Sequence, residues 1–429
     1  MEQKPISRRE FLKDMGLVVG GTLLATSPWF SAFADEGHTV GEKAKIAVVG
    51  PGSRGRYHLN LLAINPKAEV VAICDDYQPS IDEALKIVPK AKVYTDYRKM
   101  MEDKEIQGVV IATPLNTHRE IAIAALESGK HIMVEKSITK TLEDTLAVYN
   151  TWKNTDRVMF VGQQRLFDPR YIKAINLIEQ GTFGPVRRIN AYWYRNADWR
   201  RPVPSPELER KINWRLYREY SLGLMTELCC HQIQIGTWAL KEIPNTVMGV
   251  GSINHWKDGR EVYDDVSVIY NFDSGVNMNY QSVISNKFYG LEEQILCHQG
   301  TVEPEKGKYY FETVPPASGM MQMINEVEKA VFGAIPFAGP SWVPETANKN
   351  TGEYLIGEKP KEDGTRILME AFVESCITGK QPPKLAEEGY YATTLSILGD
   401  QAIQEGRILT YPDEYKIDYL NHKAPVIEG

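Results

Sequence analysis

Glu227 and His231 carry side chains that could perform acid–base chemistry, and they stand four residues apart in the sequence. At that spacing two residues share one face of a helix. A neighbouring carboxylate can orient an imidazole, or raise its pKa toward the pH at which histidine exchanges protons. The same spacing is typical of ion pairs on helix surfaces, so the pair alone leaves both interpretations open.

A second chemical pattern is the glycine-rich stretch from Gly50 to Gly55, which has the spacing G-x-G-x-x-G. Gly50 allows a tight turn, Gly52 lets backbone amides approach a pyrophosphate, and Gly55 lets the next helix pack closely on the strand. Ser53 and Arg54 lie inside the turn and are predicted to contact the cofactor. The spacing is common by chance, so its weight depends on the neighbouring elements.

Those neighbouring elements favour a dinucleotide-binding unit. Residues 45–49 form a short apolar run typical of a buried parallel strand. A second apolar run begins at residue 68 and ends in two aspartates, Asp75 and Asp76. A carboxylate there accepts hydrogen bonds from the adenosine ribose and repels a 2′-phosphate. We predict that Asp75, rather than Asp76, has this role, with an ordinary helix cap as the alternative. The pattern favours NAD over NADP, although Arg54 leaves NADP open.

Strands and helices continue to alternate through residues 109–134, which predicts an α/β fold with a parallel, doubly wound sheet. In such sheets the loops after the carboxyl ends of the strands line the cofactor crevice. The side chains predicted to face it are Thr113, Asn116, His118, Glu135 and Lys136.

The second half of the chain is rich in aromatic and cationic side chains between residues 186 and 220. Aromatic faces stack on sugar rings, while arginine and asparagine bind hydroxyl groups. Core or strand positions are the alternative for each of them. The predicted substrate-side residues are Tyr192, Tyr194, Arg195, Trp199 and Asn213. Alternating patterns over residues 263–311 predict further strands suited to an antiparallel sheet.

With these motifs in place, the chain resembles the Gfo/Idh/MocA family of oxidoreductases. The resemblance covers almost the whole chain in the family's order. Its stretches are GPGSRG (50–55), Asp75, ATPLNTH (112–118), GKHIMVEK (129–136), VGQQRLFDP (161–169), GLMTELCCHQIQIGTWAL (223–240) and ITGKQPP (377–383). It implies an N-terminal Rossmann domain and a C-terminal α/β domain with a large, mostly antiparallel open sheet. It also implies a homodimer or homotetramer formed through that sheet.

The resemblance further implies roles for single residues. In the family, a lysine after a glutamate lies between nicotinamide and substrate, and a histidine on a later helix exchanges the hydroxyl proton. Lys136 and His231 would be this catalytic pair, with Glu227 at the acidic position. Gln164 would contact the cofactor. Two departures bear on the site, because Ser137 replaces the family's proline and Glu227 replaces an aspartate. The longer Glu227 side chain could contact substrate instead of His231.

The implied activity is NAD-dependent oxidation of a hydroxyl group on a sugar or glycoside, and two alternatives remain. Residues 50–58 also resemble the G-x-G-x-R-G-R-x-H opening of NAD-dependent glycoside hydrolases. A hydrolase or epimerase that oxidises its sugar only transiently is therefore one alternative, although those hydrolases typically lack the lysine present here as Lys136. The other is a non-catalytic NAD-bound protein, which the presence of Lys136, Glu227 and His231 disfavours.

The N-terminus carries a separate signal. Residues 7–13, SRREFLK, match the twin-arginine pattern, an apolar run follows, and residues 32–34 form an A-x-A cleavage signal. We predict a leader at 1–34, a linker at 35–43, the Rossmann domain at 44–160 and a second domain at 161–429. Export of the folded protein to the periplasm follows, with a retained anchor as the alternative. An exported enzyme would keep its cofactor tightly bound and regenerate it in place.

Composition excludes several other partners. The formal net charge of −7 gives no reason to expect nucleic acid, or a membrane beyond the leader. The five cysteines form no CxxC pair, and no His/Cys/carboxylate cluster has metal-ligand spacing. We therefore expect a small carbohydrate as substrate and no metal.

Overall fold

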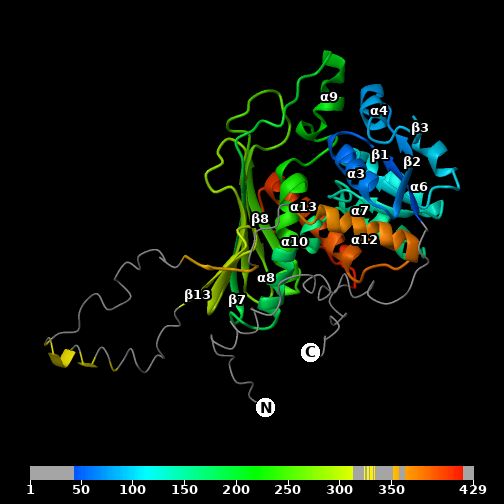
Figure 1. Cartoon of the computed structure of the whole chain (residues 1–429). Coiled ribbons are helices and arrows are strands. Elements are labelled where there is room, and N and C mark those ends of the chain that lie inside the picture. Colours follow the sequence, from blue (N-terminus) through cyan, green and yellow to red (C-terminus); the bar gives the residue numbers. More distant parts are fainter. Residues whose placement is uncertain are drawn as a thin grey trace.

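A computed structural model describes residues 43–312, 351–356 and 363–418, with isolated positions between 323 and 333. The twin-arginine pattern, the predicted cleavage site and nearly all of the predicted linker lie outside the described residues. The described chain is built on two sheets and the helices that pack on them (Figure 1).

The first sheet has six parallel strands in the order β3-β2-β1-β4-β5-β6. They are β1 (Ala44–Val49), β2 (Ala68–Cys74), β3 (Lys92–Tyr94), β4 (Gly108–Ile111), β5 (His131–Val134) and β6 (Met159–Val161). The helices between them are α3 (Ser53–Ile64), α4 (Gln78–Leu85), α5 (Tyr97–Met101), α6 (Leu115–Glu127) and α7 (Leu142–Lys153). The predicted doubly wound parallel sheet is confirmed.

The order of this sheet reverses between β1 and β4, and ligands bind at such a switch point, outside the carboxyl ends of the strands. Every residue of β4 and β5 is buried. A strand covered on both faces has a continuous apolar pattern, which is why these strands could be predicted from short apolar runs.

The second sheet has nine strands in the order β14-β13-β12-β11-β7-β10-β9-β8-β15. Its pairs are antiparallel, except that β7 and β10 run parallel. The strands are β7 (Val186–Tyr194), β8 (Thr246–Ser252), β9 (Asp265–Asn271), β10 (Asn277–Val283), β11 (Leu291–Cys297), β12 (Gly300–Glu303), β13 (Lys308–Phe311), β14 (Glu353–Tyr354) and β15 (Leu409–Thr410). The predicted large, mostly antiparallel sheet is confirmed.

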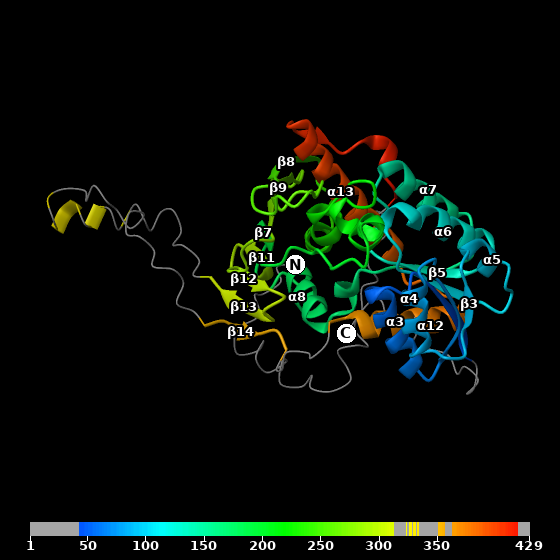
Figure 2. The same ribbon diagram turned by 90° about the horizontal axis from the view of Figure 1, so that it is seen from above.

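Helices lie between the two sheets (Figures 1 and 2). On the second sheet, α10 (Cys230–Leu240) packs against β7 and β10, and α13 (Leu385–Glu405) packs against β8. Next to α10 lies α8 (Pro169–Glu179). Late in the chain, α12 (Thr365–Thr378) returns to the first sheet and contacts β1 and α3. A Cβ on Gly108 of β4 would lie 2.7 Å from Cys376 Sγ of α12, so this contact is close.

Candidate functional site

The glycine-rich turn between β1 and α3 has the shape of a phosphate cradle. Gly50 adopts φ +80°, and a Cβ on Gly55 would lie 2.2 Å from the Gly50 carbonyl oxygen. At Gly52 a Cβ would meet nothing within 4 Å, so the backbone there is open to an approaching group. Ser53 is exposed at the start of α3, whose first turn holds no acidic side chain. Backbone N–H groups at a helix N-terminus favour phosphate, so the turn fits a dinucleotide pyrophosphate.

Asp75 follows the last residue of β2 and is half-buried at the switch-point edge of the sheet. Its Oδ1 accepts a hydrogen bond from the Tyr77 backbone N–H at 2.9 Å, which orients the carboxylate. Burial raises the pKa of Asp75 to about 6, against the lowering effect of this hydrogen bond. Asp76 is exposed and instead forms an ion pair with Lys211, at 2.8 Å. The placement of Asp75 suits a ribose-binding carboxylate.

Arg54 and His58 lie one turn apart on α3, and both contact Glu135 at the end of β5. Arg54 Nε donates to Glu135 Oε1 at 2.7 Å, and His58 Nε2 lies 2.6 Å from the same oxygen. Burial raises the pKa of Glu135, but the charge of Arg54 and the hydrogen bond with His58 outweigh it and hold the pKa well below its usual range. The carboxylate of Glu135 therefore joins α3 to β5. Sequence reasoning included His58 only in the resemblance of residues 50–58 and did not predict this contact, although its four-residue spacing from Arg54 on a helix was a usable signal.

The loop after β4 places its predicted residues differently. Thr113 lies against the glycine turn, since a Cβ on Gly50 would meet Thr113 Cγ2 at 2.7 Å. Asn116 is exposed on the first turn of α6. His118 is buried, and its ring nitrogens lie 2.9 Å from the Thr113 carbonyl oxygen and 3.1 Å from the Ile138 carbonyl oxygen. His118 thus connects two loops by their backbones.

Lys136 reaches from the end of β5 to the second domain. Its Nζ donates to the Glu227 backbone carbonyl oxygen at 2.8 Å and lies 3.8 Å from Glu227 Oε2. The next residue strengthens this junction, because Ser137 Oγ donates to the Thr226 carbonyl oxygen at 3.0 Å. The peptide bond between Lys136 and Ser137 is cis. An ammonium has three donors, so one backbone bond leaves capacity for an oxygen of a substrate.

Glu227 lies in a π-helical turn, η5 (Met225–Cys229), directly before α10. Its carboxylate accepts from Arg215 Nε at 3.0 Å and from Ser221 Oγ at 3.0 Å. Burial raises the pKa of Glu227, but the charges of Lys136 and Arg215 outweigh it and the pKa falls below its usual value. The carboxylate is therefore held ionised beside Lys136. No hydrogen bond joins it to His231 among the described contacts.

His231 lies in the first turn of α10 and is buried. Its Nδ1 has no hydrogen-bond partner within the part of the chain that the structure describes. Burial, followed by the charges of Lys136 and Arg165, holds the pKa of His231 well below its usual range. The sequence left two roles for Glu227, to orient the imidazole or to raise its pKa, and the pKa of His231 is instead lowered. Burial and the two nearby cations therefore favour the neutral imidazole, while the Glu227 carboxylate is bonded to Arg215 instead.

Gly236 shows which face of the second sheet α10 covers. A Cβ on this residue would lie 2.5 Å from Met278 Sδ of β10 and 3.8 Å from Ile189 Cδ1 of β7. Side chains at every second position of β7 share the face that Ile189 occupies. Trp193 is on that face, and its ring centre lies 5.6 Å from that of His231. Trp193 is a site residue that sequence reasoning missed.

Tyr192 and Tyr194 point to the other face of the sheet, away from His231. Tyr194 Oη donates to Gln281 Oε1 at 3.0 Å, and both tyrosine rings lie 5.5 Å from the ring of Tyr289. The structure therefore does not bring these two predicted substrate residues into the site. Successive side chains of a strand point to opposite faces of the sheet, so Trp193, which lies between the two tyrosines, faces His231 instead.

Of the other three predicted substrate residues, one lies near Trp193 and two do not. The guanidinium of Arg195 lies 4.9 Å from the Trp193 ring centre, so Arg195 borders the site. Trp199 has φ +65° and is partly buried against the core. Asn213 is buried, and its side chain is bonded to the N–H and carbonyl oxygen of Arg201 at 2.7 Å and 3.0 Å. The side-chain amide of Asn213 thus forms hydrogen bonds with the backbone of Arg201.

Residues 163–165 lie near the start of α10, where Gln163 Nε2 donates to the Cys230 carbonyl oxygen at 3.4 Å. The predicted cofactor residue Gln164 is partly buried in η2 (Gln164–Phe167), and its Oε1 has no partner among the described residues. Arg165 is buried, with its guanidinium 5.5 Å from the Trp193 ring centre and ion-paired with Glu293. The ring of Trp193 therefore has two guanidinium groups near it, those of Arg165 and Arg195.

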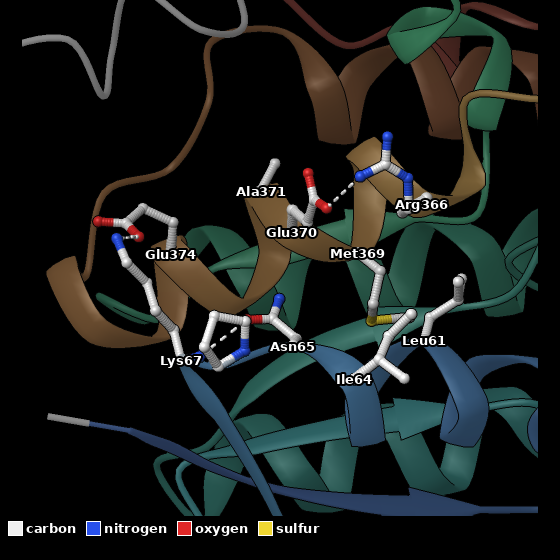
Figure 3. A pocket seen from close by; sticks show the side chains of 10 residues that line it. Leu61, Ile64, Asn65, Lys67, Arg366, Met369, Glu370, Ala371 and Glu374 are labelled. Atoms are coloured by element: carbon white, nitrogen blue, oxygen red, sulfur yellow. Dashed lines mark hydrogen bonds and ion pairs between the residues drawn. The ribbon is translucent and has the colours of Figure 1, made fainter. Parts of the chain in front are cut away.

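Elsewhere, the described residues contain no cluster of three or more His, Cys, Asp or Glu side chains that could hold a metal. None of their helices is long and apolar enough to cross a membrane. A surface pocket between α3 and α12 is lined by none of the predicted site residues (Figure 3). Its walls include the ion pair of Lys67 and Glu374, at 2.7 Å.

Two family models match the chain. The first, an oxidoreductase family with an NAD-binding Rossmann fold, matches residues 44–163. The second, the GFO/IDH/MocA C-terminal domain, matches residues 171–303. Together they span more than half of the chain.

Similar proteins include a scyllo-inositol 2-dehydrogenase (NAD(+)) of Bacillus subtilis, 26% identical over 61% of this chain and 73% of its own length. An alpha-N-acetylgalactosaminidase of Shewanella oneidensis is 28% identical over 49% of this chain, and the match spans 50% of that protein. The crystal structure of an aldose-aldose oxidoreductase from Caulobacter crescentus has a TM-score of 0.65 at 19% identity, covering 86% of this chain and 100% of that one. At that identity the likeness concerns the fold.

Proposed function

The chain belongs to the Gfo/Idh/MocA family of oxidoreductases, and from this premise we propose that it oxidises a hydroxyl group of a sugar or glycoside with bound NAD. The observation that carries the proposal is the junction between the two domains. Lys136 from the Rossmann domain donates to the backbone of Glu227, four residues before His231. Lys136 follows β5 at the carboxyl edge of the first sheet, and its charge acts on the imidazole of His231.

Each residue at the junction has one task in this proposal. His231, a neutral imidazole, accepts the proton of the substrate hydroxyl group. Lys136 stabilises the negative charge that develops on the substrate oxygen. Glu227, ionised and held by Arg215, keeps the ammonium of Lys136 in place. Trp193 presents an aromatic face next to His231, suited to the C–H surface of a sugar ring.

NAD, when bound, supplies the acceptor for the hydride of the substrate carbon. The residues that would hold it are those of the open turn at Gly52, where the pyrophosphate fits, and Asp75, where the ribose fits. Asp75 supports NAD over NADP, because a 2′-phosphate would meet its carboxylate. Glu135 would act through Arg54, which it fixes beside the turn.

We further propose that the protein is exported by the twin-arginine route with NAD already bound. The SRREFLK stretch and the A-x-A signal support this. Outside the cytoplasm there is no nicotinamide pool, so a retained cofactor would be regenerated in place by a second sugar. The aldose-aldose oxidoreductase of Caulobacter crescentus, whose name describes an exchange between sugars, has this fold.

A homo-oligomer formed through the second sheet is also proposed. Support comes from apolar side chains on strands β8 and β9 that remain exposed, namely Met248, Val250 and Ile269. Exposed apolar side chains that adjoin one another on a sheet favour contact with another protein surface. The family resemblance makes a second copy of the chain the expected partner.

A second candidate function is a glycoside hydrolase or epimerase in which the sugar is oxidised and then reduced again. One observation in its favour concerns the arginine and the histidine of the G-x-G-x-R-G-R-x-H pattern. These two residues, Arg54 and His58, both contact Glu135. The 28% identity with an alpha-N-acetylgalactosaminidase supports it as well. A non-catalytic NAD-bound protein has less support, because Lys136, Glu227 and His231 are gathered at one junction.

One experiment separates these functions. The purified protein is tested for co-purified NAD and then mixed with panels of free sugars and of nitrophenyl glycosides. Reduction of the bound cofactor by a free sugar, without release of nitrophenol, supports the dehydrogenase. Release of nitrophenol without net reduction supports the hydrolase. Neither signal with any compound in either panel would leave the non-catalytic alternative.

A further inference from the structure

A segment of the second domain bridges the two domains at the adenosine end of the dinucleotide site. We call residues 199–218 the strap. It leaves β7 and contains η3 (Pro206–Leu208), α9 (Glu209–Ile212) and η4 (Trp214–Leu216) before the chain enters η5. Figure 1 shows α9 beside α4, which belongs to the Rossmann domain.

The strap holds its own shape through polar contacts. Arg200 is ion-paired with Glu209 of α9 and with Asp258 outside the strap. Tyr217 Oη donates to Glu209 Oε1 at 2.8 Å, and Asn213 holds the backbone of Arg201. These bonds fix the beginning of the strap against its end, and the pair of Arg200 with Asp258 ties the strap to the rest of the second domain.

Two contacts attach the strap to the Rossmann domain. Lys211 Nζ lies 2.8 Å from Asp76 Oδ1 and 5.6 Å from the ring centre of Tyr77. Lys140 Nζ donates to the Arg218 carbonyl oxygen at 3.0 Å. The first contact joins the residues that directly follow Asp75, the carboxylate placed for the ribose. It therefore lies beside the position that suits the adenosine ribose.

The strap also brings positive charge toward the glycine-rich turn. Burial lowers the pKa of Arg201, and so do the charges of Arg215 and of Arg56 on α3. Arg201 has no ion pair among the described contacts, and the charge of Arg56, which follows the turn on α3, acts on its guanidinium. The strap thus carries an unpaired cation, Arg201, toward α3 and a second cation, Lys211, beside the residue that follows Asp75.

We propose that the strap is a cofactor clamp, in which the ion pair between Lys211 and Asp76 must open before NAD can leave. The proposal rests on the proposed binding of NAD and adds the part of the chain that retains it. The ligand is a dinucleotide that enters while the two domains are apart at this end. Closure of Lys211 on Asp76 then encloses the adenosine half.

The expected effect is modest and depends on salt. Lys211 and Asp76 side chains are 38% and 75% exposed, so a single ion pair between them is weak. Lys211→Ala is expected to release NAD about two- to five-fold faster than the wild type at low ionic strength. The difference shrinks as salt is raised, because added ions screen the pair. Lys211→Glu, which places two carboxylates opposite each other, releases NAD faster still.

The test measures exchange of bound NADH against excess NAD by NADH fluorescence, without any sugar. The double variant Lys211→Glu/Asp76→Lys restores the pair with opposite polarity, and we expect it to regain slow release relative to Lys211→Glu. The matched control is Arg210→Ala, because Arg210 is the preceding residue on α9 but pairs with Glu261 of its own domain, at 2.7 Å. Thermal melting checks that every variant is folded.

The outcomes are distinct. Faster release in Lys211→Ala and Lys211→Glu, with rescue by the double variant and little change in Arg210→Ala, supports the clamp. Equal release from wild type and Lys211 variants overturns the clamp but leaves sugar oxidation untouched. Equal acceleration by Arg210→Ala also overturns it, because the effect would then come from general loosening of α9. A wild type that binds no NADH overturns the proposed function and the clamp together.

Discussion

Lys136 Nζ donates a hydrogen bond to the backbone carbonyl oxygen of Glu227 at 2.8 Å, and this bond connects the end of β5 to the π-helical turn before α10. The cation of one domain is thereby placed by the backbone of the other. A backbone acceptor is insensitive to the identity of the side chain at residue 227. The position of Lys136 therefore does not depend on whether residue 227 is a glutamate or an aspartate.

Lys136→Met should abolish most of the oxidation while leaving NAD bound. The substitution keeps a long apolar side chain but removes the charge that stabilises the developing oxyanion, which is worth about 10²–10³ in rate for comparable donors. The measurement is the rate of cofactor reduction in a single turnover. Lys153→Met is the control, since Lys153 is exposed at the end of α7. An unchanged rate in Lys136→Met would remove Lys136 from the site.

The pH profile should reflect a histidine that is already neutral. Because the pKa of His231 lies well below its usual 6.5, the ring stays a proton acceptor as pH falls toward and below that value. With NAD bound, we expect kcat/KM to show no acid limb at pH 6.5, only one at lower pH. His231→Gln should lower kcat by about 10²–10⁴ and remove that limb. A limb near pH 6.5 in the wild type would mean that His231 titrates normally.

The two faces of β7 should respond differently to substitution. Trp193→Leu removes the aromatic face beside His231, and we expect a higher KM for the sugar, by about 10-fold for a loss of roughly 1.4 kcal/mol of contact. Tyr192→Leu changes the opposite face and is expected to leave KM unchanged. Steady-state kinetics on both variants makes the comparison. A larger KM effect from Tyr192→Leu would place the substrate on the outer face of the sheet.

NAD affinity should fall in acid. The pKa of Asp75 is raised to about 6, so its carboxylate is ionised above pH 6 and protonated below it. A protonated carboxyl is a poorer acceptor for the ribose hydroxyl groups, so the Kd for NAD should rise as pH falls through 6. Titrations at several pH values measure this. Asp75→Asn should bind NAD more weakly with little pH dependence between 5 and 7 (an interval of about one unit around the pKa), and retained pH dependence would point to another group.

The first sheet could be predicted from the sequence because its strands are buried on both faces and therefore form short apolar runs. The predicted strand at residues 45–49 coincides with β1 to within one residue. The glycine turn and Asp75 could be located from the sequence equally well, since both follow directly from the order of strand, turn and helix along the chain. Physical adjacency within one βαβ unit made the placement of these residues predictable, and their contact with NAD stays a prediction.

The substrate-binding residues were harder to predict from the sequence, because their position depends on which face of a sheet a distant helix covers. Residues 192–194 are all aromatic, so the pattern does not show which ones face inward. The packing of Gly236 on Met278 decides it in favour of Trp193. Similarly, the Glu227–His231 spacing was recognised, but the π-helical turn and the distant Arg215 turn the carboxylate away from the imidazole.

The most direct test of the account is a single-turnover experiment on the protein loaded with NAD and mixed with free sugars. The account predicts that at least one sugar reduces the bound cofactor in the wild type, seen as the nicotinamide absorbance of NADH. It also predicts that a second sugar, added as its aldehyde or ketone form, reoxidises that cofactor without its release. A cofactor that stays oxidised with every sugar, in a protein that binds NAD, would contradict the account.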